Sequence, residues 1–139
     1  CSAEALQRSS ICELRYNQLQ EVFANVPALH HQLVRVISGA LVTEQRHLVM
    51  MGKQQAQRRL AFFIRRVADR YERLSRDPLA LTLPMSRSDI ANYLGLALET
   101  VSRLFTRMES DGLLAVNRKS VRILRRDLLD ELCGGEIDI

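Results

Sequence analysis

Segment 87–106 constrains the fold more than any other part of the chain, because two helical apolar patterns meet there at a glycine. Ile90 and Leu94 are four residues apart, which places them on one face of a helix. Gly95 follows directly and tolerates the positive φ of a tight turn. Apolar residues then recur at spacings of three and four, as on the inner face of a second helix: Leu98, Val101, Leu104 and Phe105. The pattern predicts a helix-turn-helix.

The residues that flank the first predicted helix support this interpretation. Ser86 is a favourable N-cap, and Asp89 three residues later resembles the second member of a capping box. Ala97, where the second helix would need a cap, is a poor N-cap residue. The sequence therefore defines the start of the first helix better than the start of the second.

A β-hairpin is predicted after the second helix. Residues 113–116 and 121–124 are short apolar runs, and the polar residues 117–120 between them are typical of a turn. A helical hairpin in an ordinary core would show the same helix spacing. The capping signal and the following hairpin, which would form a wing, favour a winged helix-turn-helix.

Polar side chains lie between the apolar positions of the second helix. If that helix enters a major groove, these side chains can reach base edges and phosphates. They are Glu99, Thr100, Ser102, Arg103, Thr106 and Arg107. We also expect Ser86, Arg87 and Ser88, around the start of the first helix, to contact phosphates or to support such contacts.

Positive charge is concentrated around the predicted motif. Residues 53–126 carry sixteen basic and seven acidic side chains, net +9, whereas residues 1–52 are neutral and residues 127–139 carry −5. A phosphate backbone would bind where this field is strongest. Arginine-rich helices can also serve solubility alone, but their coincidence with the helix-turn-helix favours double-stranded DNA as the partner.

Residues 27–52 are predicted to form a long helix. Pro27 suits a first helical turn, and Gly52 interrupts the pattern at the other end. Steps of three and four define a narrow seam with one charged interruption: Val34, Ile37, Leu41, Glu44, Leu48 and Met51. A narrow seam with polar flanks suits a partner helix better than packing within one domain. We therefore expect a homodimer, because operator-binding proteins are usually two-fold symmetric.

The remaining segments complete a chain that is mainly α with a small β component. A helix over residues 54–74 would bury one apolar face and expose arginines, and its inner residues would be Leu60, Phe63, Ile64, Val67, Ala68 and Tyr71. A strand is predicted over 79–83, a short helix over 127–133, and a strand and a helix over 10–14 and 16–23. The expected organisation is an upstream-domain remnant (1–26), a dimerisation helix (27–52), a winged helix-turn-helix DNA-binding domain (53–127), and a terminal helix and tail (128–139).

Several classes of protein are disfavoured by what the sequence lacks. No run of about 18 uncharged apolar residues is present, so no membrane span is expected. The three cysteines have no paired spacing, which predicts a cytoplasmic protein without disulfides. There is no glycine-rich phosphate loop, HExxH motif or nucleophile elbow, so an enzyme is not expected and no catalytic residue is assigned.

The residues of the predicted motif resemble the Crp/Fnr superfamily of bacterial transcription regulators. The similar stretches are Met85-Ser86-Arg87, Asn92-Tyr93-Leu94-Gly95-Leu96 and Glu99-Thr100-Val101-Ser102-Arg103. The resemblance covers nearly all of the chain. It is closest to the oxygen-responsive fumarate–nitrate reduction branch, because Leu98 and Ser102 stand where the cyclic-AMP-receptor branch has Arg and Gly.

This resemblance implies a transcription regulator that binds, as a homodimer, an inverted repeat of TTGAT-like half-sites. Glu99, Ser102 and Arg103 would read the bases, with arginine bidentate to guanine and glutamate accepting from cytosine. The long helix would be the dimer helix, and the missing upstream part would be a β-roll sensor domain. The resemblance further implies control of anaerobic or redox-responsive genes and contact with RNA polymerase.

Cys12 matches the family cysteine that supplies one ligand to an oxygen-labile [4Fe–4S] cluster. The other three family ligands lie further upstream, so no cofactor is expected in this chain and the cluster would belong to a longer protein. From the residues alone, Cys12 is better explained as a small buried apolar side chain.

Other interpretations stay open from the sequence. A sister regulator of the same superfamily would respond to nitric oxide through haem, or to another effector. A helical dimerisation module that binds no DNA is the alternative from a different class. The combination of Glu99, Ser102 and Arg103 within the basic region argues against that module.

Overall fold

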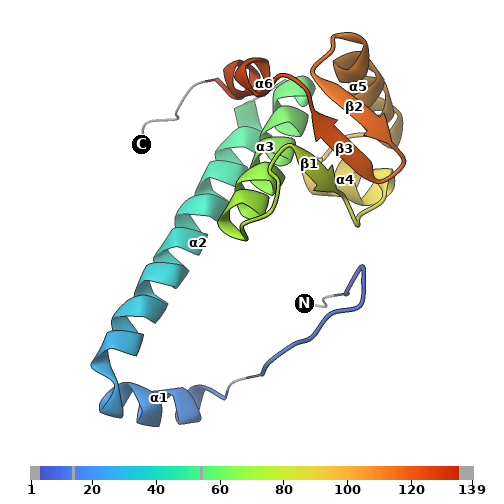
Figure 1. Ribbon diagram of the computed structural model, residues 1–139. Coiled ribbons are helices and arrows are strands. Elements are labelled where there is room, and N and C mark those ends of the chain that lie inside the picture. The colour runs from blue at the N-terminus through green and yellow to red at the C-terminus, as the bar shows by residue number, and fades with distance from the viewer. Residues whose placement is uncertain (1–3, 14, 54, 135–139) are drawn as a thin grey trace. The chain divides into compact units, whose positions relative to one another are not determined.

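The computed structural model describes residues 4–13, 15–53 and 55–134. The chain forms two compact units that divide after Met50. The described residues form six helices and three strands, and Figure 1 labels them in chain order. None of the described helices has the length and apolar character that crossing a bilayer demands.

The first unit is helical. Helix α1 spans Tyr16–Asn25, and helix α2 begins at Pro27, as predicted, and ends at Lys53. Gly52 lies inside α2, one residue before its end, so the helix ends close to where the sequence predicted. A glycine in a helix costs about 1 kcal/mol relative to alanine, which a long helix tolerates.

The strand predicted over residues 10–14 is also wrong for residues 10–13, which are not in a strand; Leu14 lies outside the described residues. A strand needs a neighbour for its backbone hydrogen bonds, and none of the three described strands pairs with this segment. Cys12 is exposed there, so its interpretation as a small buried side chain is wrong as well.

The seam of α2 is open along the part that the structure describes. Val34 and Ile37 are each 50% exposed and Leu41 is 60% exposed, and Glu44 is exposed beside them. The side chains of Leu48 and Met51 lie outside the described residues. An exposed row of aliphatic side chains on one helix is what a partner helix would cover.

The second unit combines helices with a small antiparallel sheet (Figure 1). Its order is α3 (Ala56–Arg73), β1 (Ala80–Thr82), α4 (Arg87–Leu94), α5 (Leu98–Ser110), β2 (Leu114–Asn117), β3 (Ser120–Ile123) and α6 (Arg126–Cys133). Strand β3 is central, with Val121 opposite both Leu81 of β1 and Val116 of β2. The mainly α architecture with a small sheet is confirmed.

One apolar core holds the second unit together. The inner face predicted for α3 is confirmed, because Leu60, Ile64 and Ala68 are buried. Val101 and Met108 are buried on the inner face of α5, and Leu129 is buried on the inner face of α6. Met108, which the sequence interpretation omitted, is fully inaccessible because it continues the same helical face one turn beyond the predicted set.

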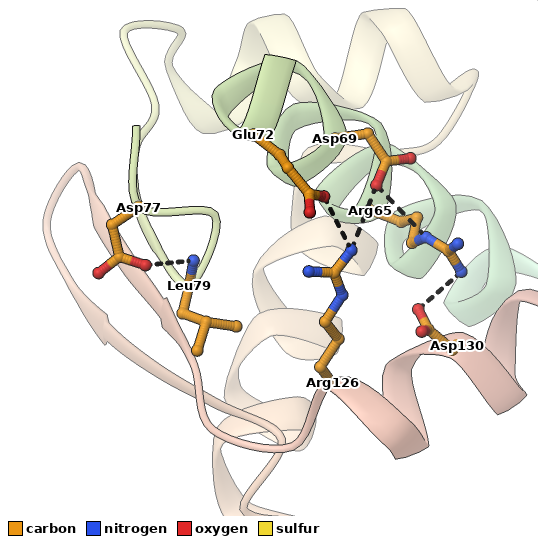
Figure 2. Close-up of polar contacts among 7 residues, drawn as sticks. All are labelled: Arg65, Asp69, Glu72, Asp77, Leu79, Arg126 and Asp130. Carbon is orange, nitrogen blue, oxygen red and sulfur yellow. Dashed lines mark hydrogen bonds and ion pairs between the residues drawn. The ribbon is translucent and has the colours of Figure 1, made fainter. Parts of the chain in front are cut away.

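Ion pairs join α6 to α3, as Figure 2 shows. Arg65 on α3 contacts Asp130 on α6 at 2.7 Å, and Arg126 on α6 contacts Glu72 on α3 at 3.2 Å. Asp69 lies between the two arginines, at 3.6 Å from Arg65 and 3.7 Å from Arg126. The side chains are more than a third exposed, so each pair contributes little stability alone and the network mainly fixes how α6 lies on α3.

Candidate nucleic-acid interface

A complete capping box sets the start of α4. The Asp89 N–H donates to the Ser86 hydroxyl at 3.1 Å, and a carboxylate oxygen of Asp89 accepts from the Ser86 N–H at 2.8 Å. The Ser86 hydroxyl also donates to this carboxylate at 2.7 Å. Hydrogen bonds from Ser86 lower the pKa of Asp89, with a smaller contribution from the charge of Lys119. The capping box predicted from the sequence is confirmed.

Gly95 makes the turn between α4 and α5. Its φ is 60° and its ψ is 41°, the left-handed conformation that glycine adopts without a steric penalty. The Leu96 N–H then donates to the Ala91 carbonyl at 3.0 Å, which closes the end of α4. Ala91 is 3% exposed, consistent with a small residue between closely packed helices.

The outer face of α5 carries a stripe of polar side chains. Glu99, Ser102, Arg103 and Thr106 follow the spacing i, i+3, i+4, i+7, and all four are exposed. Arg107 is exposed at the edge of this stripe, whereas Thr100 is half-buried. The three residues expected to read bases are therefore together on the solvent face of one helix.

Two side chains of this face make contacts with residues one helical turn away. The Thr106 hydroxyl donates to the Ser102 carbonyl at 3.2 Å, one helical turn back. Arg107 lies 3.8 Å from Asp111 in an exposed ion pair, which is weak enough for the guanidinium to leave for a phosphate. Glu99 and Arg103 are the two charged side chains of the stripe itself.

The prediction that Leu98 lies on the inner face of α5 is wrong. It is the first residue of the helix and is 44% exposed. Leu96, just before the helix, is partly buried against the core in its place. Ala97 makes no side-chain cap, so the apolar entry from Leu96, rather than a polar cap, defines the start of α5.

Arg87, expected to contact or support phosphate, stacks on α5 instead of pointing straight to solvent. Its guanidinium carbon lies 3.4 Å from the ring centroid of Phe105. Burial lowers the pKa of Arg87, and the nearby Glu109 carboxylate opposes that shift. Ser88, the next residue, is exposed on α4.

The turn of the hairpin after α5 is shorter than the predicted turn over residues 117–120. Asn117 and Ser120 are paired strand residues, so only Arg118 and Lys119 form the turn, and Arg118 adopts a φ of 54°. Lys119 donates to the Pro84 carbonyl at 3.0 Å, which ties the turn to the segment before α4. Arg118 and the exposed Arg122 add positive charge that the sequence interpretation did not assign to the site.

The described residues do not fit an iron–sulfur cluster. A four-iron cluster is held by four thiolates, and the described chain holds no close group of three or more His, Cys, Asp or Glu side chains. Burial raises the pKa of the Cys133 thiol to about 11, so this thiol stays protonated and is a poor metal ligand.

The chain matches known bacterial regulators along its length. Residues 83–114, which include α4 and α5, match the model of the bacterial regulatory proteins of the crp family. The chain is 39% identical over 137 residues to the transcriptional activator protein FnrA of Stutzerimonas stutzeri, covering 99% of this chain and 56% of that protein. It is 37% identical over 132 residues to the fumarate and nitrate reduction regulatory protein of Escherichia coli (strain K12), covering 95% and 53%.

A solved structure shows a similar fold. FixK2 from Bradyrhizobium japonicum superposes with a TM-score of 0.79 at 27% identity, over 88% of this chain and 61% of that one. The chain thus spans little more than half the length of the relatives it matches. The names of these relatives describe transcriptional activators and regulators, not enzymes.

Proposed function

Because the chain belongs to the Crp/Fnr superfamily of bacterial regulatory proteins, in its fumarate–nitrate reduction branch, we propose that it binds DNA sequence-specifically to regulate transcription. The observation that supports this most is the exposed stripe on α5. It joins a carboxylate, a hydroxyl and a guanidinium, at Glu99, Ser102 and Arg103, on one helix of a basic unit. An α-helix fits the major groove, where these three groups are the kinds that read base edges.

The proposed roles follow from the chemistry of each side chain. Arg103 is proposed to donate two hydrogen bonds to a guanine, and Glu99 to accept one from the amino group of a cytosine. Ser102 can serve as donor or acceptor beside them. Arg107 and Ser88 are proposed phosphate contacts, Thr100 and Thr106 support α5 as the proposed recognition helix, and Ser86 acts through its cap. The proposed target is an inverted repeat of TTGAT-like half-sites.

Binding as a homodimer is the second part of the proposal. The exposed seam residues Val34, Ile37 and Leu41 support pairing of α2 with its copy. Leu48 and Met51 would continue this seam. Control of anaerobic or redox-responsive genes and contact with RNA polymerase are proposed for the whole protein, by analogy with the activators that the chain resembles.

Replacing Glu44 with alanine is expected to tighten the dimer. In a parallel pair a seam residue meets its own copy, so two Glu44 carboxylates would repel each other. Analytical ultracentrifugation at neutral pH compares the dissociation constants of the parent and Glu44→Ala chains. Gln45→Ala, on the exposed flank, is the control. A dimer that was unchanged or weaker in Glu44→Ala would show that Glu44 does not face its copy.

DNA affinity is expected to fall steeply with salt. Each phosphate that the basic unit neutralises contributes about −0.9 to the slope of log K against log salt. Fluorescence anisotropy of a labelled duplex over a series of salt concentrations measures this slope. An affinity that hardly changes with salt, or no binding at all, would favour a helical dimerisation module over a DNA-binding regulator.

A further inference from the structure

Arg87 is the first residue of α4, and its guanidinium contacts α5. It lies over the Phe105 ring at 3.4 Å from the centroid, and Phe105 is 3% exposed. A cation over an aromatic face is attracted by the ring quadrupole, most strongly where water is excluded. Because the ring is held in the core, Arg87 contacts a fixed surface of α5.

A second contact joins α5 to the wing through Glu109. Glu109 lies one helical turn after Phe105, and its charge acts on Arg87. A carboxylate oxygen of Glu109 also accepts from the Val116 N–H of β2 at 3.0 Å. Two contacts therefore hold α5 to its neighbours: Arg87 of α4 lies over the Phe105 ring, and Glu109 accepts from the Val116 N–H of β2.

We propose that Arg87 is a positioning residue for base recognition, which sets the rotation of α5 through the Phe105 ring and touches no base itself. This inference rests on the proposed function. Rotating a helix by about ten degrees moves a group about 6 Å from its axis by about 1 Å. Hydrogen bonds to base edges tolerate only a few tenths of an ångström around their preferred length, so such a rotation would lose them.

The competing role for Arg87 is that of an ordinary phosphate ligand. A phosphate ligand contributes to counterion release, and its removal makes the salt slope less steep by about 0.9 without changing base preference. A positioning residue has the opposite signature, because its removal lowers base preference and leaves the salt slope unchanged. The two roles are therefore separable in one set of titrations.

The test is a double-mutant cycle of Arg87→Gln and Phe105→Leu in the whole chain. Phe105→Leu removes the ring face but changes no charge, so a loss of base preference in it cannot come from a missing phosphate contact. The measured quantity is the affinity for a duplex with the proposed inverted repeat, divided by the affinity for the same duplex with one base pair replaced in each half-site. Circular dichroism melts check that each variant is folded, and Arg87→Gln alters only a partly exposed side chain.

Each single variant is expected to lower this ratio roughly three- to thirtyfold, the range that corresponds to a cation–π contact, with the salt slope unchanged. The double variant should lose no more than either single variant. Arg107→Gln, the matched control, should keep the ratio and make the salt slope less steep by about 0.9.

A parent ratio of one would overturn the proposed function and this inference with it. A parent that discriminates, together with an Arg87→Gln variant that keeps the ratio, would overturn this inference alone. The same holds if Phe105→Leu folds and keeps the ratio, or if the losses of the two single variants simply add.

Discussion

Replacing Leu60 with alanine should lower the free energy of unfolding of the second unit by about 2–5 kcal/mol, the usual cost of such a truncation in a core. Leu60 is fully inaccessible on α3, and this helix packs against α5, α6 and β1. Truncation removes apolar contacts with a core that the recognition helix shares. The loss would therefore reduce the fraction of molecules that present an ordered α5.

Urea unfolding followed by far-ultraviolet circular dichroism measures this change. Leu74→Ala is the matched control, because Leu74 directly follows α3 but is 56% exposed, so its change should stay within about 0.5 kcal/mol. A Leu60→Ala variant as stable as this control would contradict the placement of Leu60 in the packed core.

Replacing Arg103 with alanine should weaken binding to the matched site by about 1–3 kcal/mol and relax discrimination at one base pair. An arginine that makes two hydrogen bonds to one base contributes both to affinity and to discrimination between bases. Its removal is therefore expected to lower both. Arg103 is exposed on the same face of α5 as Glu99 and Ser102, the face proposed to enter the major groove.

Arg107→Ala is the comparison for Arg103→Ala. Arg107 is exposed one turn later and is paired only loosely with Asp111 at 3.8 Å. As a phosphate contact it should weaken all duplexes about equally. Anisotropy titrations against a set of single-base-pair variants separate the two cases, and a uniform loss in both variants would exclude Arg103 as a base reader.

The local features of the second unit were the most predictable from sequence. The capping box of Ser86 and Asp89 and the turn at Gly95 depend on residues within one helical turn, and the structure confirms both. The hairpin and the short helix α6 were predicted to within about two residues, because apolar runs and turn residues define them locally. The family resemblance, carried by the same residues, is confirmed by the relatives.

Features that depend on tertiary contacts were not predictable. Periodicity placed Leu98 inside, but Leu96 takes the core position because the chain enters α5 from the turn. The stacking of Arg87 on Phe105 joins residues 18 positions apart, and the bond between Lys119 and Pro84 spans 35 positions. Neither pair follows a spacing that a sequence pattern records.

A comparison of three duplexes tests sequence-specific two-fold binding most directly. The first duplex carries the proposed inverted repeat, the second has the same bases shuffled, and the third has its half-sites moved apart by about half a helical turn, roughly five base pairs. We predict that the chain binds the first more tightly than either of the others at every salt concentration, because both recognition helices then enter the groove on one side of the DNA. Equal affinity for all three duplexes would contradict sequence-specific two-fold binding.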